Sequence, residues 1–187
     1  MTAQEAETKF TRMYEAHHKQ VLAYCLRRSP SDGWDAAADT FAVAWKRIDI
    51  APEGEGSLPW LYTVARKVLA NTYRKNETAA RLNLRLGRLA GPATVGPDVQ
   101  VVQRWEEKQL IEALRRLRPD DSEVLRLATW EELPHDQIAE ILGISVSAVG
   151  QRIHRATKRL GRQLKGSMKT EATTNPNPHA AEEGRTA

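Results

Sequence analysis

Residues 134–160 read PHDQIAEILGISVSAVGQRIHRATKRL, and this stretch decides the fold of the second half of the chain. Pro134 starts a short predicted helix, and Gly143 suits the left-handed position of a tight turn at its end. Ile144 is expected to be a buried residue of this turn, and Ser145 is expected to be the N-cap of a second helix. The apolar positions expected to form the inner faces are Ile138, Ala139, Ile141, Leu142, Val149, Ile153, Ala156 and Leu160. Two helices joined by a short glycine turn predict a helix-turn-helix.

The second helix of this motif carries polar and basic side chains on its predicted outer face. They are Ser147, Gln151, Arg152, His154, Arg155, Lys158 and Arg159. Residues near the start of such a helix can meet base edges in the major groove, and basic residues further along can meet phosphates. An inert helical hairpin is the alternative interpretation, but spacing and charge together favour DNA binding.

A second stretch, residues 59–75, reads PWLYTVARKVLANTYRK and interleaves aromatic with basic residues on one predicted helix. Its members of interest are Trp60, Tyr62, Arg66, Lys67, Asn71, Tyr73, Arg74 and Lys75. Aromatic rings stack on unpaired bases while basic groups neutralise phosphates, which suits single-stranded nucleic acid. The alternative is that the aromatics, Trp60 above all and also Tyr62, are core residues.

Glycine and proline residues mark the predicted boundaries between the structured parts of the chain. Residues 87–98 read GRLAGPATVGPD, which predicts a flexible linker. Residues 166–187 contain no Leu, Ile, Val or aromatic residue, which predicts a disordered tail. No strand pattern is found, so we predict an all-α protein with two small helical domains, 8–86 and 99–165.

The first predicted domain contains three helices. One covers about 8–28 and a second about 35–49, with Phe41, Ala44, Trp45 and Ile48 expected in the core. A third begins at Ser57, which is expected as its N-cap, with Pro59 in its first turn.

Charge is distributed in blocks along the chain. The total is 28 Lys plus Arg against 24 Asp plus Glu, a net charge of +4. Residues 66–88 hold seven bases and one acid, and residues 151–169 hold seven bases and no acid, whereas 31–65 and 104–150 are acidic. Two separated basic stretches indicate two contacts with a polyanion, with strongly salt-dependent binding.

Other function classes find little support. A lone Cys25 excludes a disulfide framework, and no histidine has zinc-ligand spacing, so no metal, cofactor or enzyme activity is expected. No apolar run approaches the roughly 18 residues of a membrane span, and no signal peptide is recognisable. We therefore expect a soluble, cytoplasmic protein.

Three segments together resemble the extracytoplasmic-function (ECF) sigma factors of bacterial RNA polymerase. Residues 35–45 (DAAADTFAVAW) are similar to the region 2 helix that holds the polymerase clamp. Residues 60–74 resemble the helix that melts and reads the promoter −10 element, and 117–160 resemble region 4, which reads the −35 element. The resemblance covers about 10–164. It departs from the family pattern at Trp34, Ala38 and Gly150, where polar or basic residues are frequent.

The resemblance implies three working surfaces. Asp35, Asp39, Lys46 and Arg47 would contact the polymerase clamp. The −10 element would be bound by loop 50–58 with Trp60, Arg66, Lys67, Asn71, Arg74 and Lys75. The outer face of the 146–160 helix, from Ser147 to Arg159, would meet the −35 element, and the linker 87–98 would let both halves reach DNA.

The implied partners are core RNA polymerase, promoter DNA and an anti-sigma factor, with a monomer expected when the protein is free of polymerase. Two alternatives stay open at this point. An autonomous helix-turn-helix regulator would use residues 10–86 for dimerisation or ligand binding, and an interaction protein would mainly sequester a partner.

Overall fold

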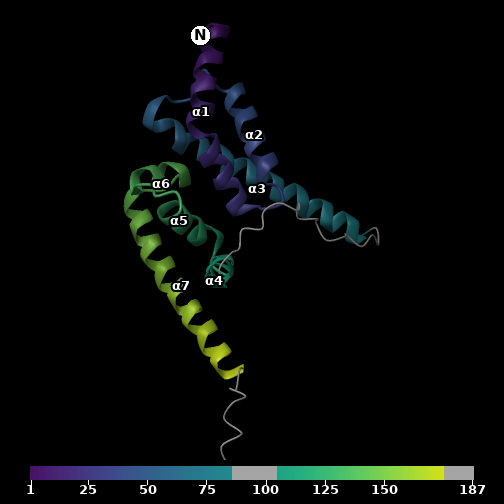
Figure 1. The fold of residues 1–187 in the computed structure, drawn as a ribbon, viewed down its shortest axis with the longest axis vertical. Coiled ribbons are helices and arrows are strands. Elements are labelled where there is room, and N and C mark those ends of the chain that lie inside the picture. Colours follow the sequence, from purple (N-terminus) through teal and green to yellow (C-terminus); the bar gives the residue numbers. More distant parts are fainter. Residues whose placement is uncertain (86–104, 175–187) are drawn as a thin grey trace, which may run out of the picture. The chain divides into compact units, whose positions relative to one another are not determined.

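The computed structural model describes residues 1–85 and 105–174, with side chains described over 1–82 and 110–164. Within these ranges every regular element is a helix (Figure 1), which confirms the all-α prediction. The predicted linker, residues 87–98, lies outside the described residues, as do residues 175–187 of the predicted tail.

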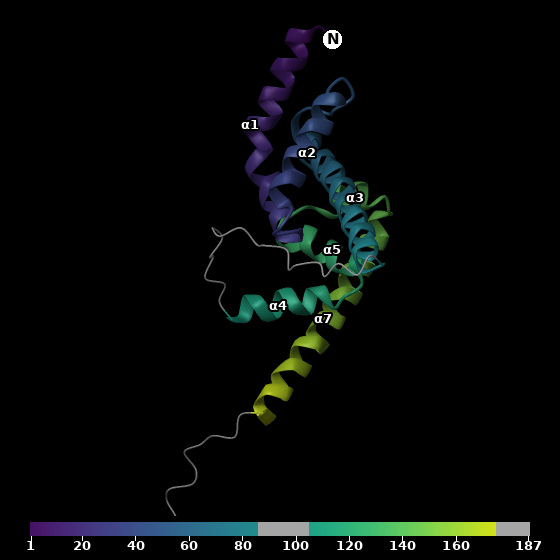
Figure 2. The same cartoon turned by 90° about the vertical axis from the view of Figure 1, so that its right-hand side faces the viewer.

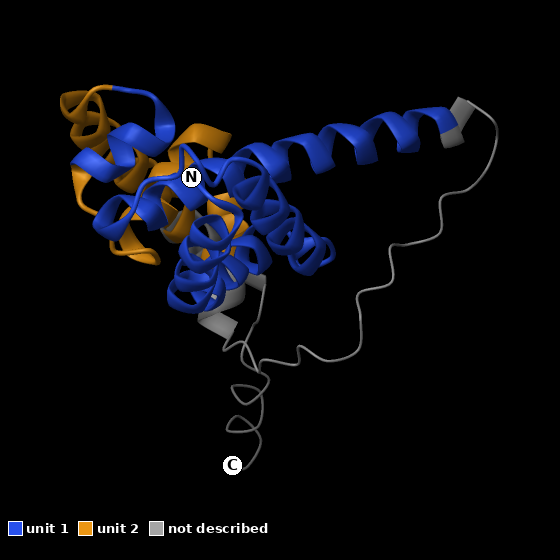
Figure 3. Cartoon of the chain, turned by 90° about the horizontal axis from the view of Figure 1, so that it is seen from above, with its two compact units in different colours: residues 1–100, 136–144 blue, residues 101–135, 145–187 orange. Residues whose placement is uncertain are grey.

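The chain divides into two compact units (Figure 3). The first comprises residues 1–100 and 136–144, and the second residues 101–135 and 145–187. This grouping differs from the predicted domains at residues 136–144, which belong to the first unit. The boundary at residues 87–98 stays a prediction.

Three helices make up most of the first unit: α1 (Ala3–Arg28), α2 (Gly33–Lys46) and α3 (Ser57–Arg85), with a short 3₁₀ turn, η1 (Gly54–Gly56), before α3. The three α-helices contact one another pairwise (Figures 1 and 2). The C-terminal part of α3 extends beyond α1 and α2 (Figure 3), and nearly all of its side chains from Asn71 to Leu82 are exposed.

Helix α1 begins five residues before its predicted start because its N-terminus is capped. The Thr2 hydroxyl accepts a hydrogen bond from the Glu5 N–H at 3.2 Å, and the Thr2 N–H donates to the Glu5 carboxylate at 2.7 Å. This reciprocal capping box satisfies two N–H groups that would otherwise be unpaired at a helix end. Its sequence signature, T-x-x-E, lies at residues 2–5.

The core of the first unit joins all three helices. The fully buried side chains of these three helices are Val21, Tyr24, Cys25, Thr40, Ala44, Leu61 and Ala65, with Tyr62 at 2 % exposure. The rings of Tyr24 and Tyr62 stack at 4.7 Å, and the Arg28 guanidinium lies 3.3 Å from the centre of the Tyr24 ring. Stacked aromatics of this kind add to the stabilisation from their buried area.

Two sequence expectations about this unit were wrong. Trp45 is 47 % exposed and not a core residue, because the buried face of α2 follows Phe41 and Ala44. The centre of its ring system lies 5.2 Å from that of Phe10, in an edge-to-face arrangement. Ser57 is already helical and does not cap α3. Its hydroxyl donates instead to the Gly54 carbonyl at 2.7 Å. Pro59 lies in the first turn, as predicted.

The second unit contains α4 (Trp105–Arg115), α5 (Pro119–Thr129) and α7 (Val146–Thr174). Helices α4 and α5 both contact α7 and each other (Figure 2). The buried side chains of this unit include Ala113, Leu114, Leu117, Val124, Leu125, Leu127, Val149 and Ala156. Ile153 and Leu160, expected in the core, are half-buried.

Helix α7 continues nine residues beyond the predicted domain end at 165. It reaches Thr174, so residues 166–174 are helical and not disordered. Four of these nine residues, Met168, Lys169, Glu171 and Ala172, are good helix formers.

The predicted turn between two helices is confirmed at residues 143–145. Helix α6 (His135–Leu142) ends with the Gly143 N–H donating to the Glu140 carbonyl at 3.3 Å and the Ile144 N–H to the Ala139 carbonyl at 3.1 Å. This is a Schellman motif, and it requires the left-handed φ of +65° at Gly143. Ser145 then caps α7, its hydroxyl accepting from the Ala148 N–H at 3.2 Å. Ile144 is half-buried, not fully buried as expected.

Candidate nucleic-acid interface

The outer face of α7 is built largely as predicted. Ser147, Gln151, His154, Arg155 and Lys158 are exposed, whereas Arg152 and Arg159 are half-buried. The N-cap at Ser145 fixes where α7 starts, and burial of Val149 and Ala156 fixes which side of the helix faces the core. The exposed polar side chains therefore lie on the opposite side, as a surface that duplex DNA could approach.

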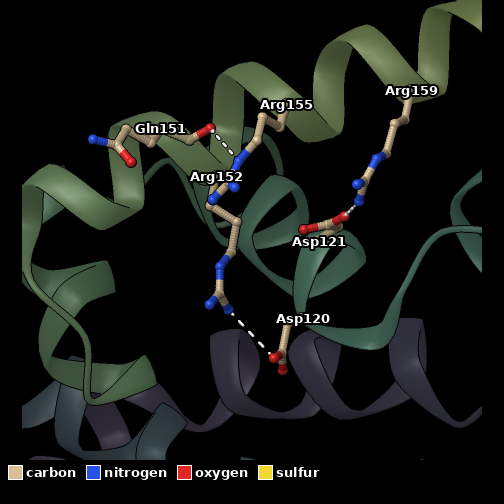
Figure 4. Close-up of polar contacts among 6 residues, drawn as sticks. All are labelled: Asp120, Asp121, Gln151, Arg152, Arg155 and Arg159. Carbon is tan, nitrogen blue, oxygen red and sulfur yellow. Dashed lines mark hydrogen bonds and ion pairs between the residues drawn. The ribbon is translucent and has the colours of Figure 1, made fainter.

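Two arginines of this face bind carboxylates of α5 (Figure 4). Arg152 Nη1 lies 3.4 Å from Asp120 Oδ2, and Arg159 Nη1 forms an ion pair with Asp121 Oδ2. Arg155 lies between them on α7, and its Nε–H donates to the Gln151 carbonyl at 3.3 Å. The structure thus separates the predicted DNA-facing bases into two that are held within the unit and two, Arg155 and Lys158, that have no carboxylate partner among the described side chains.

Helix formation explains why the carboxylates are at this position. Asp120 and Asp121 lie in the first turn of α5, where negative charge complements the helix dipole. With Arg118, Pro119 and the three α7 arginines they line an open pocket of about 510 Å³. Arg118 and both aspartates were not predicted from the sequence, since a first-turn acid suggests helix capping rather than a partner for a distant helix.

The aromatic and basic helix predicted at 59–75 is the first part of α3, and its residues divide into two groups. Tyr62 is core, as the alternative interpretation held, whereas Trp60, which that interpretation also placed in the core, is only half-buried. Tyr73 is 71 % exposed. The exposed polar side chains are Lys67, Asn71, Arg74 and Lys75, with Arg66 half-buried. An Arg74 N–H donates to the Asn71 side-chain carbonyl, which orients both groups one turn apart.

Loop 50–58 is tied to α1 by a chain of hydrogen bonds. His17 Nε2 lies 2.7 Å from Ser57 Oγ, which itself donates to the Gly54 carbonyl at 2.7 Å. Lys9 Nζ also lies 3.5 Å from Glu53 Oε1. A pocket of about 320 Å³ lies between α1 and this loop, lined by Lys9, Arg12, Met13, Ala16, His17, Pro52, Glu53, Gly54 and Ser57.

The hydrogen bonds that link His17, Ser57 and Gly54 determine which ring nitrogen of His17 donates a hydrogen. The single hydroxyl hydrogen of Ser57 is committed to Gly54, so Nε2 of His17 must donate. The other ring nitrogen, Nδ1, is buried and has no hydrogen-bond partner among the residues that the structure describes. Burial lowers the pKa of His17 because the charged ring would lose water without gaining a partner at Nδ1.

The exposed face of α2 carries the residues predicted for a partner contact. Asp35, Asp39, Lys46 and Arg47 are all exposed. Trp34, Ala38 and Trp45 are also exposed beside them, so this face combines charge with large apolar side chains. Tryptophan is enriched at protein–protein interfaces and among the residues that contribute most to their binding energy.

The described residues show no group of three or more His, Cys, Asp or Glu side chains that could hold a metal ion, and Cys25 is buried. No helix among the same residues has the length and apolar character needed to cross a membrane.

Comparison with known proteins assigns the chain to a family. Residues 107–160 match the family described as Sigma-70, region 4. The chain is 30 % identical over 159 residues to the RNA polymerase sigma factor CnrH of Cupriavidus metallidurans, covering 80 % of this chain and 83 % of that one. It is 27 % identical over 160 residues to the ECF RNA polymerase sigma factor BldN of Streptomyces coelicolor, covering 83 % and 60 %. The chain belongs to the ECF sigma factors.

The fold of this sigma factor also occurs among solved structures. One is the sigma factor RpoE of Bartonella quintana, whose structure was determined in complex with the anti-sigma factor NepR. It superposes with a TM-score of 0.66 at 22 % identity, covering 83 % of this chain and 96 % of that one. The relatives are sigma factors, which are transcription initiation factors rather than enzymes.

Proposed function

We propose that this ECF sigma factor binds core RNA polymerase in the cytoplasm and directs initiation at specific promoters. In this proposal α7 reads the −35 element, while α3 and loop 50–58 read and melt the −10 element. The observation that carries it is the outer face of α7, where Gln151, Arg155 and Lys158 are exposed on a helix whose start is fixed by a glycine turn and a serine cap.

Each element supplies a different kind of contact. Gln151 and Ser147 near the start of α7 can hydrogen-bond to base edges, while Arg155 and Lys158 can bind phosphates. Tyr73 offers a ring for stacking on an unpaired base, and Arg74 and Lys75 beside it offer charge. The pocket between α1 and loop 50–58 supports the idea that an extruded base is held there, since a flipped base requires a pocket next to the strand.

The exposed α2 face would bind the polymerase. Its aspartates Asp35 and Asp39 suit a basic partner surface, and its tryptophans supply apolar area. An anti-sigma factor is proposed as a second partner that covers this face, by analogy with the complex formed by the Bartonella quintana protein.

Run-off transcription tests the proposal. Purified core polymerase with this protein should produce transcripts from a subset of a promoter-fragment pool, and core alone should not. Sequencing the transcribed fragments would give the recognised elements. If no complex with core forms while the protein alone binds one duplex sequence tightly, the autonomous-regulator alternative is correct instead.

A further inference from the structure

The two ion pairs between α5 and α7 differ in how deeply they are buried. In the first, the Asp121 side chain is 11 % exposed and that of Arg159 is 41 % exposed. In the second, the Asp120 side chain is 62 % exposed and that of Arg152 is 25 % exposed. The pairs lie two turns apart on α7 and on adjacent residues of α5 (Figure 4). From these exposed fractions, Asp121 makes a structural contact within the unit, whereas the Asp120 carboxylate is open to solvent.

The buried carboxylate has a structural task. Asp121 lies in the interface between α5 and α7, where losing its partner would leave an uncompensated charge. Arg159 therefore acts first as the counter-ion of Asp121. Its guanidinium is a positioning group that holds α7 against α5, rather than a group offered mainly to DNA.

The exposed carboxylate is placed to act differently. An ion pair with one partner more than half exposed contributes little to stability, because water screens it. A phosphate oxygen can replace such a carboxylate as the partner of Arg152 at little cost to the fold. Neighbouring Arg155 carries no carboxylate, and Arg159 is paired with the buried Asp121. Arg152 is therefore the base of this face whose charge is partly cancelled by a solvent-exposed carboxylate before DNA arrives.

We infer that Asp120 is an internal competitor for the DNA phosphate at Arg152 and thereby weakens the binding of the α7 face to duplex DNA. This inference rests on the proposed function, since it assumes that α7 meets DNA. The consequence is lower affinity for any sequence, so that stable binding depends more on base contacts by the start of α7 and on the polymerase.

The test is a binding titration of the full-length protein with a fluorescein-labelled mixed-sequence duplex of about 30 base pairs, followed by fluorescence anisotropy. Asp120→Asn should tighten binding by roughly two- to fivefold, which is the size of effect an exposed pair allows. The increase in DNA affinity caused by Asp120→Asn should become smaller as the salt concentration rises, because screening weakens the attraction between the Asp120 carboxylate and Arg152.

Matched variants make the result specific. Glu112→Gln removes a carboxylate of the same unit that pairs with Arg116 at 3.8 Å, and it changes the net charge equally. It should therefore tighten binding less than Asp120→Asn does. In an Arg152→Gln background, Asp120→Asn should give no more than the Glu112→Gln effect, since the competed group is gone.

The outcomes separate the inference from the proposed function. If Asp120→Asn and Glu112→Gln are equal in the wild-type background, or if the Asp120→Asn gain persists without Arg152, the inference is wrong. Arg155→Gln tests the proposed function independently, because it should weaken duplex binding whatever Asp120 does. An unchanged affinity for Arg155→Gln would contradict the proposed role of α7 itself. Circular dichroism of each variant verifies that its helices are retained.

Discussion

At Gly33 the absence of a side chain decides how closely α1 and α2 approach. A Cβ atom at this position would lie 2.8 Å from the Leu26 Cα and 2.9 Å from the Leu26 backbone nitrogen. Backbone atoms cannot move aside as the end of a flexible side chain can. The corner between the first two helices therefore depends on one glycine.

Gly33→Ala should destabilise the protein by about 1–3 kcal/mol or more, the usual cost of overpacking. Gly161→Ala is the matched control, because Gly161 is also helical but a Cβ atom there would meet nothing within 4 Å. Its alanine variant should be stabilised by roughly 0.5–1 kcal/mol through the lower backbone entropy cost. Thermal or urea denaturation of both variants checks the sign of each change, and equal effects would contradict this account of the corner.

His17 gives the stability of the first unit a pH dependence. Burial lowers its pKa in the folded state, so the unfolded chain binds the proton more readily. Stability should therefore be complete above the ordinary histidine pKa of about 6.5 and should decline as the pH falls below it. His17→Gln keeps an N–H donor for Ser57 but cannot titrate, and should reduce this dependence.

Melting temperatures measured at about pH 7.5 and about pH 5.5, on either side of that pKa, test the assignment. His18→Gln is the control, since the His18 Nδ1 atom lies 3.0 Å from the Tyr14 carbonyl on an exposed stretch of α1. A His17→Gln variant with the same pH dependence as wild type would show that another group is responsible.

At the scale of elements, much of the architecture follows from the sequence, and the exceptions have physical reasons. The turn at Gly143 and the cap at Ser145 were predicted because both depend on local chemistry within a few residues. The pairing of Asp121 with Arg159 joins residues 38 apart in the chain, and periodicity carries no signal for such a contact. Exposure of Trp45 likewise depends on which neighbours α2 meets, not on its own spacing.

Tyr62 and Tyr73 both lie in the aromatic and basic stretch 59–75 of α3, but Tyr62 is buried and Tyr73 is exposed. Tyr62→Ala should cost about 3–5 kcal/mol of stability, as truncation of a buried aromatic does. Tyr73→Ala should leave stability nearly unchanged but weaken binding to single-stranded DNA, by about 1–3 kcal/mol if its ring stacks on one base. Denaturation and anisotropy with a labelled single strand measure the two effects, and unchanged single-strand binding by Tyr73→Ala would exclude the stacking role.

At the scale of the whole molecule, the net charge of +4 conceals an uneven distribution. The basic stretch at 151–169 offers less positive charge to a partner than its seven bases indicate, because Arg152 and Arg159 are paired with α5 carboxylates. The acidic stretch 31–65, which includes α2, lies in the first unit and directly precedes the basic stretch 66–88. Such a distribution suits a protein that meets an enzyme surface and a polyanion at once.

Permanganate footprinting of a cognate promoter with core polymerase tests the central claim most directly. With wild-type protein, unpaired thymines should appear at the −10 element, and core alone should give none. An Arg155→Gln, Lys158→Gln double variant of α7 should lose opening together with protection of the −35 element. An Arg74→Gln, Lys75→Gln double variant of α3 should lose opening while the −35 protection persists. Opening that is unaffected by both double variants would contradict the account.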